Sequence, residues 1–190
     1  MSMDRYRAEL TAFVRGIYEG EKKVLVFGEG EVGAPVMMVG EAPGEQETLL
    51  GRPFVGKAGK NLDAFLQEAG MERPALYVTN TVKFRPTKRS PAGRIVNRPP
   101  TQEEVKLFLP WLKKEIELVA PKCVVTLGNV PLRALTDRGR TIGEAHGQFL
   151  EMGSRLLFPM YHPASLIYNP SLKEAYRRDI LSFAQWYRQL

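Results

Sequence analysis

The sequence predicts a single domain, residues 1–190, with a three-layer α/β/α fold around a four-stranded, mostly parallel sheet. Short apolar runs have the composition of strands buried on both faces, and segments with helical periodicity lie between them. The runs are residues 36–39, 76–80, 123–127 and 156–160. A chain of 190 residues, 44% hydrophobic and 25% charged, is long enough for one buried core and too short for two ordinary domains.

The helices are predicted from apolar periodicity and from capping signals. Residues 10–17 and 62–69 carry apolar stripes at helical spacing, and Gly70 provides a stop signal after the second stripe. Thr101, with a glutamate three residues later, opens a further helix that Pro110 is expected to kink or split. Asn129 is expected to cap the next helix, and the run that begins at Ser171 repeats the capping signature before the last one.

Composition restricts the location and the metal chemistry of the protein. No apolar run approaches the roughly 20 residues of a membrane span, and residues 1–23 lack the apolar core of a signal peptide, so we expect a cytoplasmic protein without a membrane partner. The single cysteine, Cys123, excludes a disulfide framework or a four-cysteine metal site and is expected in the core. His146 and His162 lack ligand spacing, so we expect no metal.

Two glycine-rich runs have the spacing of nucleotide-binding motifs without their context. Residues 28–33 read G-x-G-x-x-G, but a strand follows them, so we expect a turn between two strands. Residues 51–57 read G-x-x-x-x-G-K, but Ala58 has no hydroxyl to hold magnesium, and Pro53 and Phe54 hinder a nest of backbone N–H groups. A nucleotide enzyme therefore remains only as an alternative.

Polar segments follow the predicted strands, at the sheet edge where α/β proteins bind ligands. Four motifs in this chain, in this order, resemble those of uracil-DNA glycosylases, with the bacterial and archaeal family 4 enzymes as the nearest group. They are residues 40–45 (GEAPGE), 51–59 (GRPFVGKAG), 77–83 (YVTNTVK) and 162–164 (HPA). The resemblance covers about residues 26–170 and implies a monomer that flips uracil out of DNA, hydrolyses its N-glycosidic bond and leaves an abasic site.

The resemblance and the chemistry of the side chains together assign the catalytic centre. Glu41 is expected to orient water and stabilise positive charge on the sugar, and His162 to donate a hydrogen bond to uracil O2. Phe54 is expected to stack on the flipped base, and Asn80 to accept from N3–H and donate to O4. Each has an ordinary alternative: a solvated loop acid, a turn histidine, a core aromatic and a turn asparagine.

Four further residues complete the predicted base pocket by resemblance: Gly40, Ala42, Glu47 and Asn97. Asn97 stands where one branch of the superfamily has a histidine that links covalently to DNA. An amide nitrogen is a poor nucleophile, so we expect ordinary turnover, with Asn97 positioning water or substrate.

A basic run without acids, residues 84–100, fits either a solvated loop or an arm that contacts DNA phosphates. The candidate phosphate contacts are Arg85, Lys88, Arg89, Arg94 and Arg98. Beyond His162, the segment Ser165, Leu166 and Ile167 is expected by resemblance to enter the minor groove, where an apolar side chain fills the gap left by the flipped base.

Family 4 enzymes bind a four-iron–four-sulfur cluster through four cysteines, and here the chain departs from the family. Phe84 and Phe108 stand at two of the ligand positions, and residues 12–16, where the other pair belongs, contain no cysteine. We therefore expect no cofactor and hypothesise that the two rings pack together in its place. The expected partner is DNA with uracil or another deaminated base; the alternatives are a hypoxanthine or xanthine glycosylase and a non-catalytic DNA-binding relative.

Overall fold

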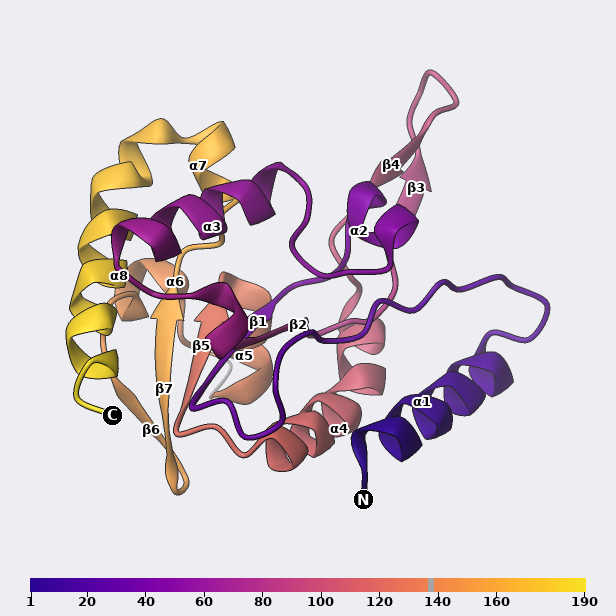
Figure 1. The fold of residues 1–190 in the computed structure, drawn as a ribbon. Coiled ribbons are helices and arrows are strands. Elements are labelled where there is room, and N and C mark those ends of the chain that lie inside the picture. The colour runs from indigo at the N-terminus through magenta and orange to yellow at the C-terminus, as the bar shows by residue number, and fades with distance from the viewer. Residues whose placement is uncertain (137–138) are drawn as a thin grey trace.

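The computed structural model describes residues 1–136 and 139–190, in which the main sheet has the strand order β2-β1-β5-β7-β6 (Figure 1). The strands are β1 (Val36–Gly40), β2 (Tyr77–Asn80), β5 (Cys123–Leu127), β6 (Leu150–Met152) and β7 (Arg155–Met160). The pairings β1–β2, β1–β5 and β5–β7 are parallel, which confirms the four predicted strands to within about one residue at each end. The short antiparallel edge strand β6 is a fifth strand that the sequence analysis missed.

Helices cover both faces of the sheet, as predicted for a three-layer fold. One face packs against α3 (Lys57–Glu68) and α8 (Lys173–Tyr187), and the other against α4 (Gln102–Val119) and α5 (Asn129–Leu135). The N-terminal helix α1 (Met3–Ile17) packs on α4 at the outside of the second layer (Figure 1). No helix in the described part of the chain combines the length and apolarity needed to cross a membrane.

Shorter elements connect these layers. They are α2 (Glu45–Leu50), the hairpin strands β3 (Thr87–Arg89) and β4 (Ile95–Asn97), α6 (Ile142–Ala145), α7 (Ser165–Tyr168), and the 3-10 turns Arg73–Ala75 and Pro170–Leu172. The antiparallel β3–β4 hairpin projects from the body next to α2 (Figure 1). It lies within the basic run and was not predicted as a hairpin.

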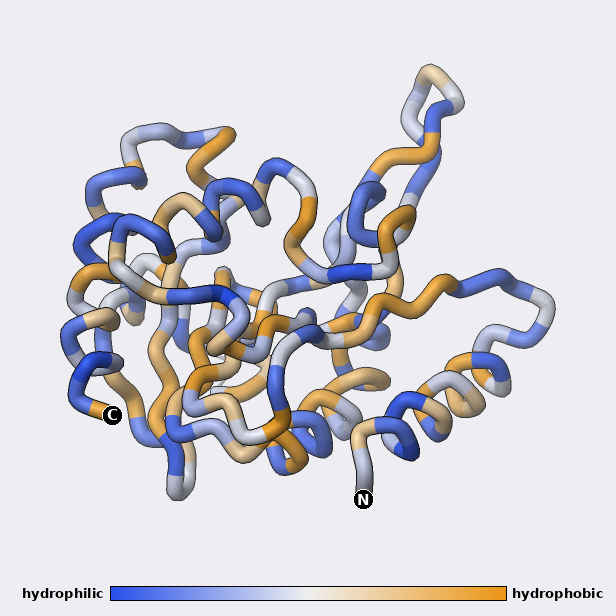
Figure 2. Tube along the Cα trace, in the orientation of Figure 1, coloured by the Kyte–Doolittle hydropathy of each residue, from blue (hydrophilic) through white to orange (hydrophobic). Residues whose placement is uncertain are grey.

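The central strand β1 shows why the apolar runs predict strands. Val36 and Met38 face the core beneath α3 and α8, whereas Met37 and Val39 face α4. A strand with apolar side chains on both faces is stable only when helices cover both, which is the arrangement of a parallel sheet. Figure 2 shows these central strands as apolar, with hydrophilic residues concentrated on the outer helix faces.

Helix α4 confirms the predicted capping box and corrects the prediction at Pro110. The side chain of Thr101 accepts from the Glu104 N–H, and the Glu104 carboxylate accepts from the Thr101 N–H. The helix continues through Pro110 as one element and is not split. Phe108 and Leu112, one turn apart around the proline, are fully buried, so core packing holds the two halves together.

Two other predicted caps are wrong. Asn129 is the first residue of α5, and its Oδ1 accepts from the backbone N–H of Ile142 at 2.8 Å, so a tertiary contact uses the expected capping group. Ser171 lies in a 3-10 turn, where it donates to Asn169, and α8 begins only at Lys173. In both cases the side chain bonds to a partner outside the predicted helix terminus.

The remaining predictions concern the first glycine run and the cysteine. Residues 28–33 form the approach to β1, but only an isolated bridge between Glu29 and Val78 precedes the turn, so no full strand lies before it. Cys123 is buried in β5, and burial raises the pKa of its thiol to about 12, as expected for a core cysteine. Among the described residues, no three His, Cys, Asp or Glu side chains gather in a way that holds a metal ion.

Candidate active site

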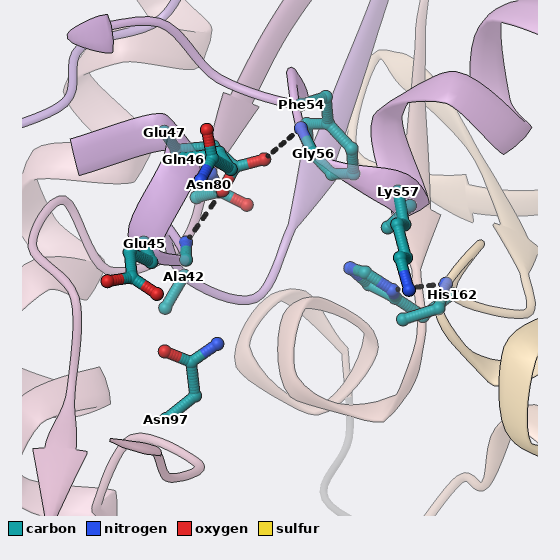
Figure 3. A pocket seen from close by; sticks show the side chains of 13 residues that line it. Ala42, Glu45, Gln46, Glu47, Phe54, Gly56, Lys57, Asn80, Asn97 and His162 are labelled. Atoms are coloured by element: carbon teal, nitrogen blue, oxygen red, sulfur yellow. Dashed lines mark hydrogen bonds between the residues drawn. The ribbon is translucent and has the colours of Figure 1, made fainter. Parts of the chain in front are cut away.

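A cavity of about 320 Å³ lies at the carboxyl edge of the parallel strands, where the sequence analysis expects the ligand (Figure 3). Its walls come from the segment after β1, the loop before α3, the end of β2, strand β4 and the segment after β7. The residues that line it are Ala42, Gly44, Glu45, Gln46, Glu47, Phe54, Gly56, Lys57, Ala58, Asn80, Asn97, His162 and Ala164. The predicted residues Ala42, Glu47, Phe54, Asn80, Asn97 and His162 are among them.

Phe54 forms an aromatic wall of the cavity. Its ring stacks on the imidazole of His162 with 5.8 Å between ring centroids and 29° between planes. Gly40 lies behind it, because a Cβ at this position would overlap both the Phe54 ring and the Asn80 amide oxygen. The absence of a side chain at Gly40 therefore brings the wall and the amide together. Gly40 is not among the described residues that line the cavity, and its role in substrate binding stays a prediction.

Asn80 ends β2 and is 3% exposed. The sheet register places it directly opposite Gly40 on β1, so its side chain emerges at the same edge. Within the described residues the side-chain amide has no hydrogen-bond partner in the protein, although it is almost fully buried. A buried amide without a protein partner is costly unless a ligand or water satisfies it, so Asn80 is available to read the edge of a bound heterocycle.

His162 follows β7 and is held as a neutral hydrogen-bond donor. Its Nδ1 accepts from the backbone N–H of Ala164 at 3.0 Å, which requires Nδ1 to be unprotonated and leaves the proton on Nε2. Burial lowers the pKa of His162 to about 4, and the nearby charge of Glu47 only partly opposes this effect. The imidazole is therefore neutral at physiological pH and offers one N–H to the cavity.

Glu47 organises two of the loops that form the cavity. Its Oε2 accepts from the backbone N–H of Gly44 at 3.1 Å, and its Oε1 accepts from Val55 at 3.0 Å and Gly56 at 2.9 Å. Figure 3 shows the carboxylate between these loops. The N–H groups that would have to cradle a phosphate in the G-x-x-x-x-G-K run are thus already bonded to a carboxylate. This arrangement argues against the nucleotide-enzyme alternative.

Glu41 lies between Gly40 and the cavity residue Ala42, but its own side chain is not among the described residues that line the cavity. Its backbone carbonyl accepts from the Val82 N–H at 3.0 Å, which ties the exit of β1 to the segment after β2. Burial raises the pKa of the Glu41 carboxyl group. The structure therefore places Glu41 next to the cavity in the chain, and its catalytic role stays a prediction.

The predicted phosphate contacts fall into two groups. Arg85 donates from Nε to Asn97 at 2.6 Å, and Arg98 donates two N–H groups to Glu104 at 2.7 and 2.8 Å, so both guanidinium groups are engaged within the protein. The others lie on the projecting β3–β4 hairpin with exposed side chains: Lys88, Arg89 and Arg94, of which Arg89 also donates to the Gly93 carbonyl at 3.3 Å. The hairpin residues are the ones positioned to meet a polyanion.

The segment beyond His162 forms α7. Ile167 is 44% exposed, whereas Leu166 packs partly against the main core and Ser165 is half-buried. Of the three residues predicted to enter the minor groove, Ile167 is thus the exposed apolar side chain. Its neighbour Tyr168 is 87% exposed.

Sequence reasoning missed a buried charged network beneath the cavity. The Lys83 ammonium, fully buried, donates to Glu115 Oε2, to Thr79 Oγ1 and to the backbone carbonyl of Asn80, each at 2.6 Å. Glu115 also accepts from the Tyr77 hydroxyl at 3.0 Å. The network fixes the end of β2 to α4. Lys83 and Glu115 lie far apart in the sequence, and only Lys83 belongs to a recognised motif, so no local pattern indicates the pair.

Lys57, Glu45 and Gln46 line the cavity and were also not predicted. Lys57 is the last residue of the G-x-x-x-x-G-K run, so the run that resembled a phosphate loop does contribute to the site. Glu45 is the last residue of the motif at residues 40–45 and Gln46 follows it; both lie at the start of α2, and their proximity to Glu47 was the available signal.

An aromatic wall, a free buried amide and a neutral imidazole at the carboxyl edge of a parallel sheet define an α/β protein that receives a planar nitrogen heterocycle. The family model of the Uracil DNA glycosylase superfamily matches residues 27–185, and the chain belongs to this superfamily. This finding confirms the resemblance on which the site residues were assigned.

Individual relatives agree with the family match. The chain is 36% identical over 170 residues to a type-4 uracil-DNA glycosylase of Pyrobaculum aerophilum, covering 85% of this chain and 83% of the relative. It is 35% identical over 167 residues to a type-4 uracil-DNA glycosylase of Saccharolobus solfataricus, covering 83% and 74%. The crystal structure of SMUG2 from Pedobacter heparinus has a TM-score of 0.56 at 10% identity, covering 98% of this chain and 83% of that one, and supports the fold.

The buried network leads to a prediction about stability. Lys83→Met is expected to lower the free energy of unfolding by about 3–5 kcal/mol, because it leaves the Glu115 carboxylate buried without its cation. The double variant Lys83→Met/Glu115→Met is expected to regain most of this loss, since it removes both charges. Urea unfolding followed by tryptophan fluorescence measures both changes.

Lys113→Met, at an exposed position on the same helix as Glu115, is the matched control and should change stability by less than about 0.5 kcal/mol. If the double variant is as unstable as Lys83→Met, the unpaired charge of Glu115 is not the cause of the lost stability.

Proposed function

We propose that the protein is a DNA glycosylase that hydrolyses the N-glycosidic bond of deoxyuridine and leaves an abasic site, the first step of base excision repair. The observation that carries the proposal is the convergence of Phe54, Asn80 and His162 on one cavity. The type-4 uracil-DNA glycosylases to which the chain is similar support uracil as the base.

In this proposal the uracil enters the cavity after it has left the DNA stack, because its glycosidic bond is not accessible within a duplex. The ring of Phe54 stacks on it. The Asn80 amide accepts from N3–H and donates to O4, a pattern that cytosine inverts, so cytosine would leave the buried amide mismatched. Glu47 supports this selection by fixing the loops on both sides of the cavity.

The chemistry proceeds by cleavage of the C1′–N1 bond, which leaves the electron pair and a negative charge on the uracil ring. The Nε2–H of His162 donates to O2 and stabilises this charge without transferring a proton. The Glu41 carboxylate stabilises the positive charge on the sugar and orients the water whose oxygen forms the new bond to C1′. As that bond forms, the carboxylate accepts the proton that the water loses, and this proton balances the charge of the departing uracil anion. Asn97, fixed by Arg85 at the edge of the cavity, positions water or the substrate.

DNA binding is proposed to use two elements beside the cavity. The basic side chains of the β3–β4 hairpin, Lys88, Arg89 and Arg94, contact phosphates, and their contribution to affinity falls as salt rises. Ile167 on α7 fills the gap that the flipped nucleotide leaves. Arg85 and Arg98 bond within the protein, so we propose that they stabilise the base of the hairpin and are not the main phosphate contacts.

The iron–sulfur cluster that the family resemblance implies does not fit the residues present. Phe84 and Phe108 are buried with 5.6 Å between ring centroids, and Val14 of the N-terminal helix lies in the same apolar cluster. Aromatic carbons cannot replace thiolate ligands, and Cys123 lies in β5, within the main core. We propose that apolar packing, worth roughly 2–3 kcal/mol for each buried ring, replaces the cluster as the link between these segments.

The first prediction of the proposed function is that the protein excises uracil from DNA and that alkali then breaks the strand at the abasic site. Under single-turnover conditions, His162→Ala is expected to lower the rate about 100-fold, since one preorganised donor contributes about 3 kcal/mol. Glu41→Ala should lower it at least about tenfold, whereas Glu31→Ala, at an exposed loop position, should not change it.

The same assay includes oligonucleotides with hypoxanthine or xanthine. Faster excision of either base than of uracil would assign a different substrate. Retarded gels without alkali-labile breaks on any lesion would assign a non-catalytic DNA-binding role.

A second prediction concerns pH. Burial raises the pKa of Glu41, so the catalytic carboxylate is lost first as the pH falls. His162, with its pKa lowered to about 4, stays neutral through the same range. The single-turnover rate should therefore decrease on acidification with the titration of Glu41, and Glu41→Gln should flatten this decrease at a lower rate. An acid limb that is unchanged in Glu41→Gln would rule out Glu41 as the titrating group.

A third prediction concerns the cofactor. The protein purified without air is expected to contain neither iron nor acid-labile sulfide and to lack the visible absorption of an iron–sulfur cluster. Iron in the amount of one cluster per chain would contradict the proposed replacement by the packed phenylalanines.

A further inference from the structure

Arg73 bonds to the loop that carries the aromatic wall of the cavity. It lies in the 3-10 turn Arg73–Ala75 that leads into β2, and 19% of its side chain is exposed. Its Nη1 donates to the backbone carbonyl of Phe54 at 2.8 Å, and its Nη2 donates to that of Pro53 at 2.5 Å. The guanidinium group thus links the segment before Asn80 to the segment that contains Phe54.

The backbone that Arg73 holds is in an unfavourable conformation. Phe54 has φ 52°, in the left-handed region that residues with a side chain rarely adopt. Its carbonyl oxygen packs against Gly59, where a Cβ would overlap it. The carbonyl is therefore enclosed between Gly59 and Arg73. Strained backbone of this kind persists only where surrounding contacts over-determine it.

The two carbonyl bonds distinguish Arg73 from a surface charge. Its carboxylate contact, Asp63 at 2.9 Å, is 49% exposed at the side chain, so solvent screens that ion pair. The other neighbouring acid, Glu29, lies 4.0 Å away and pairs with Arg52 at 2.6 Å. Two N–H groups in a fixed fork match two adjacent carbonyls, which the single ammonium group of lysine does not.

We propose that Arg73 is a positioning residue for base recognition. By bonding the carbonyls of Pro53 and Phe54, it holds Phe54 in the left-handed conformation that directs the ring toward Gly40 and His162. Arg73 does not line the cavity and acts on the substrate only through Phe54. This inference rests on the proposed function for its substrate, a flipped pyrimidine.

A double-mutant cycle tests the proposal. Arg73→Met is expected to lower kcat/KM on uracil-containing single-stranded DNA about 30-fold in the wild-type background and less than about threefold in Phe54→Ala. Arg73→Lys, which keeps the charge but not the fork, should show an intermediate loss. Asp63→Asn removes the exposed ion pair and leaves both carbonyl bonds, so it should stay within about twofold of wild type.

The same cycle is measured by fluorescence anisotropy with DNA that contains 2′-fluoro-deoxyuridine, which resists cleavage. If the wild-type protein does not cleave uracil DNA, the proposed function fails, and the binding cycle still decides whether Arg73 acts through Phe54. Thermal unfolding of each variant shows that it is folded, and Arg73→Lys replaces Arg73→Met in the cycle if the latter does not fold. Equal losses from the Arg73 variant in both backgrounds, or no loss in either, would overturn the proposal.

Discussion

The cavity depends on close approach at one backbone position. The parallel register of β1 and β2 places Gly40 beside Asn80, and the missing side chain at Gly40 lets the Phe54 ring and the Asn80 amide oxygen occupy the space that a Cβ would fill. Phe54 and Asn80 come from segments remote in sequence, and they meet because the sheet brings both segments to its carboxyl edge. His162, which follows β7, completes the site on the same edge.

Charged side chains stabilise the irregular backbone around this edge. Loops at a strand end have N–H and C=O groups that the sheet ladder no longer satisfies, and burying them without partners is costly. Glu47 accepts from three such N–H groups, and Lys83 donates to the last carbonyl of β2. Each charge forms several charge-assisted hydrogen bonds, which offset its desolvation. The result is a site whose walls are held by bonds to backbone rather than by side-chain packing alone.

The sequence predicts the parts of this structure that follow from local pattern. The four parallel strands are readable because each is apolar on both faces, and the binding edge follows from their parallel order. The hairpin strand β4 and the edge strand β6 are short and partly exposed, so they have no such pattern. The pairing of Lys83 with Glu115 depends on which distant segments meet, and that of Arg98 with Glu104 depends on how the six-residue approach to α4 folds back on the helix. No spacing rule contains that information, and the assignment of Arg98 to DNA could not anticipate its buried partner.

The protonation state of His162 connects the fold to the chemistry. A protonated imidazole would gain attraction from Glu47, but that carboxylate already accepts from three N–H donors. Ala164 presents a further N–H to the imidazole Nδ1, which a proton there would oppose. Burial therefore determines the outcome, and the ring remains neutral. A neutral donor binds a neutral uracil only modestly and a uracil anion more strongly, because the hydrogen bond strengthens as charge develops. On the proposed function, the fold thus reserves the stabilisation by His162 for the transition state, which is the condition under which a hydrogen bond accelerates bond cleavage.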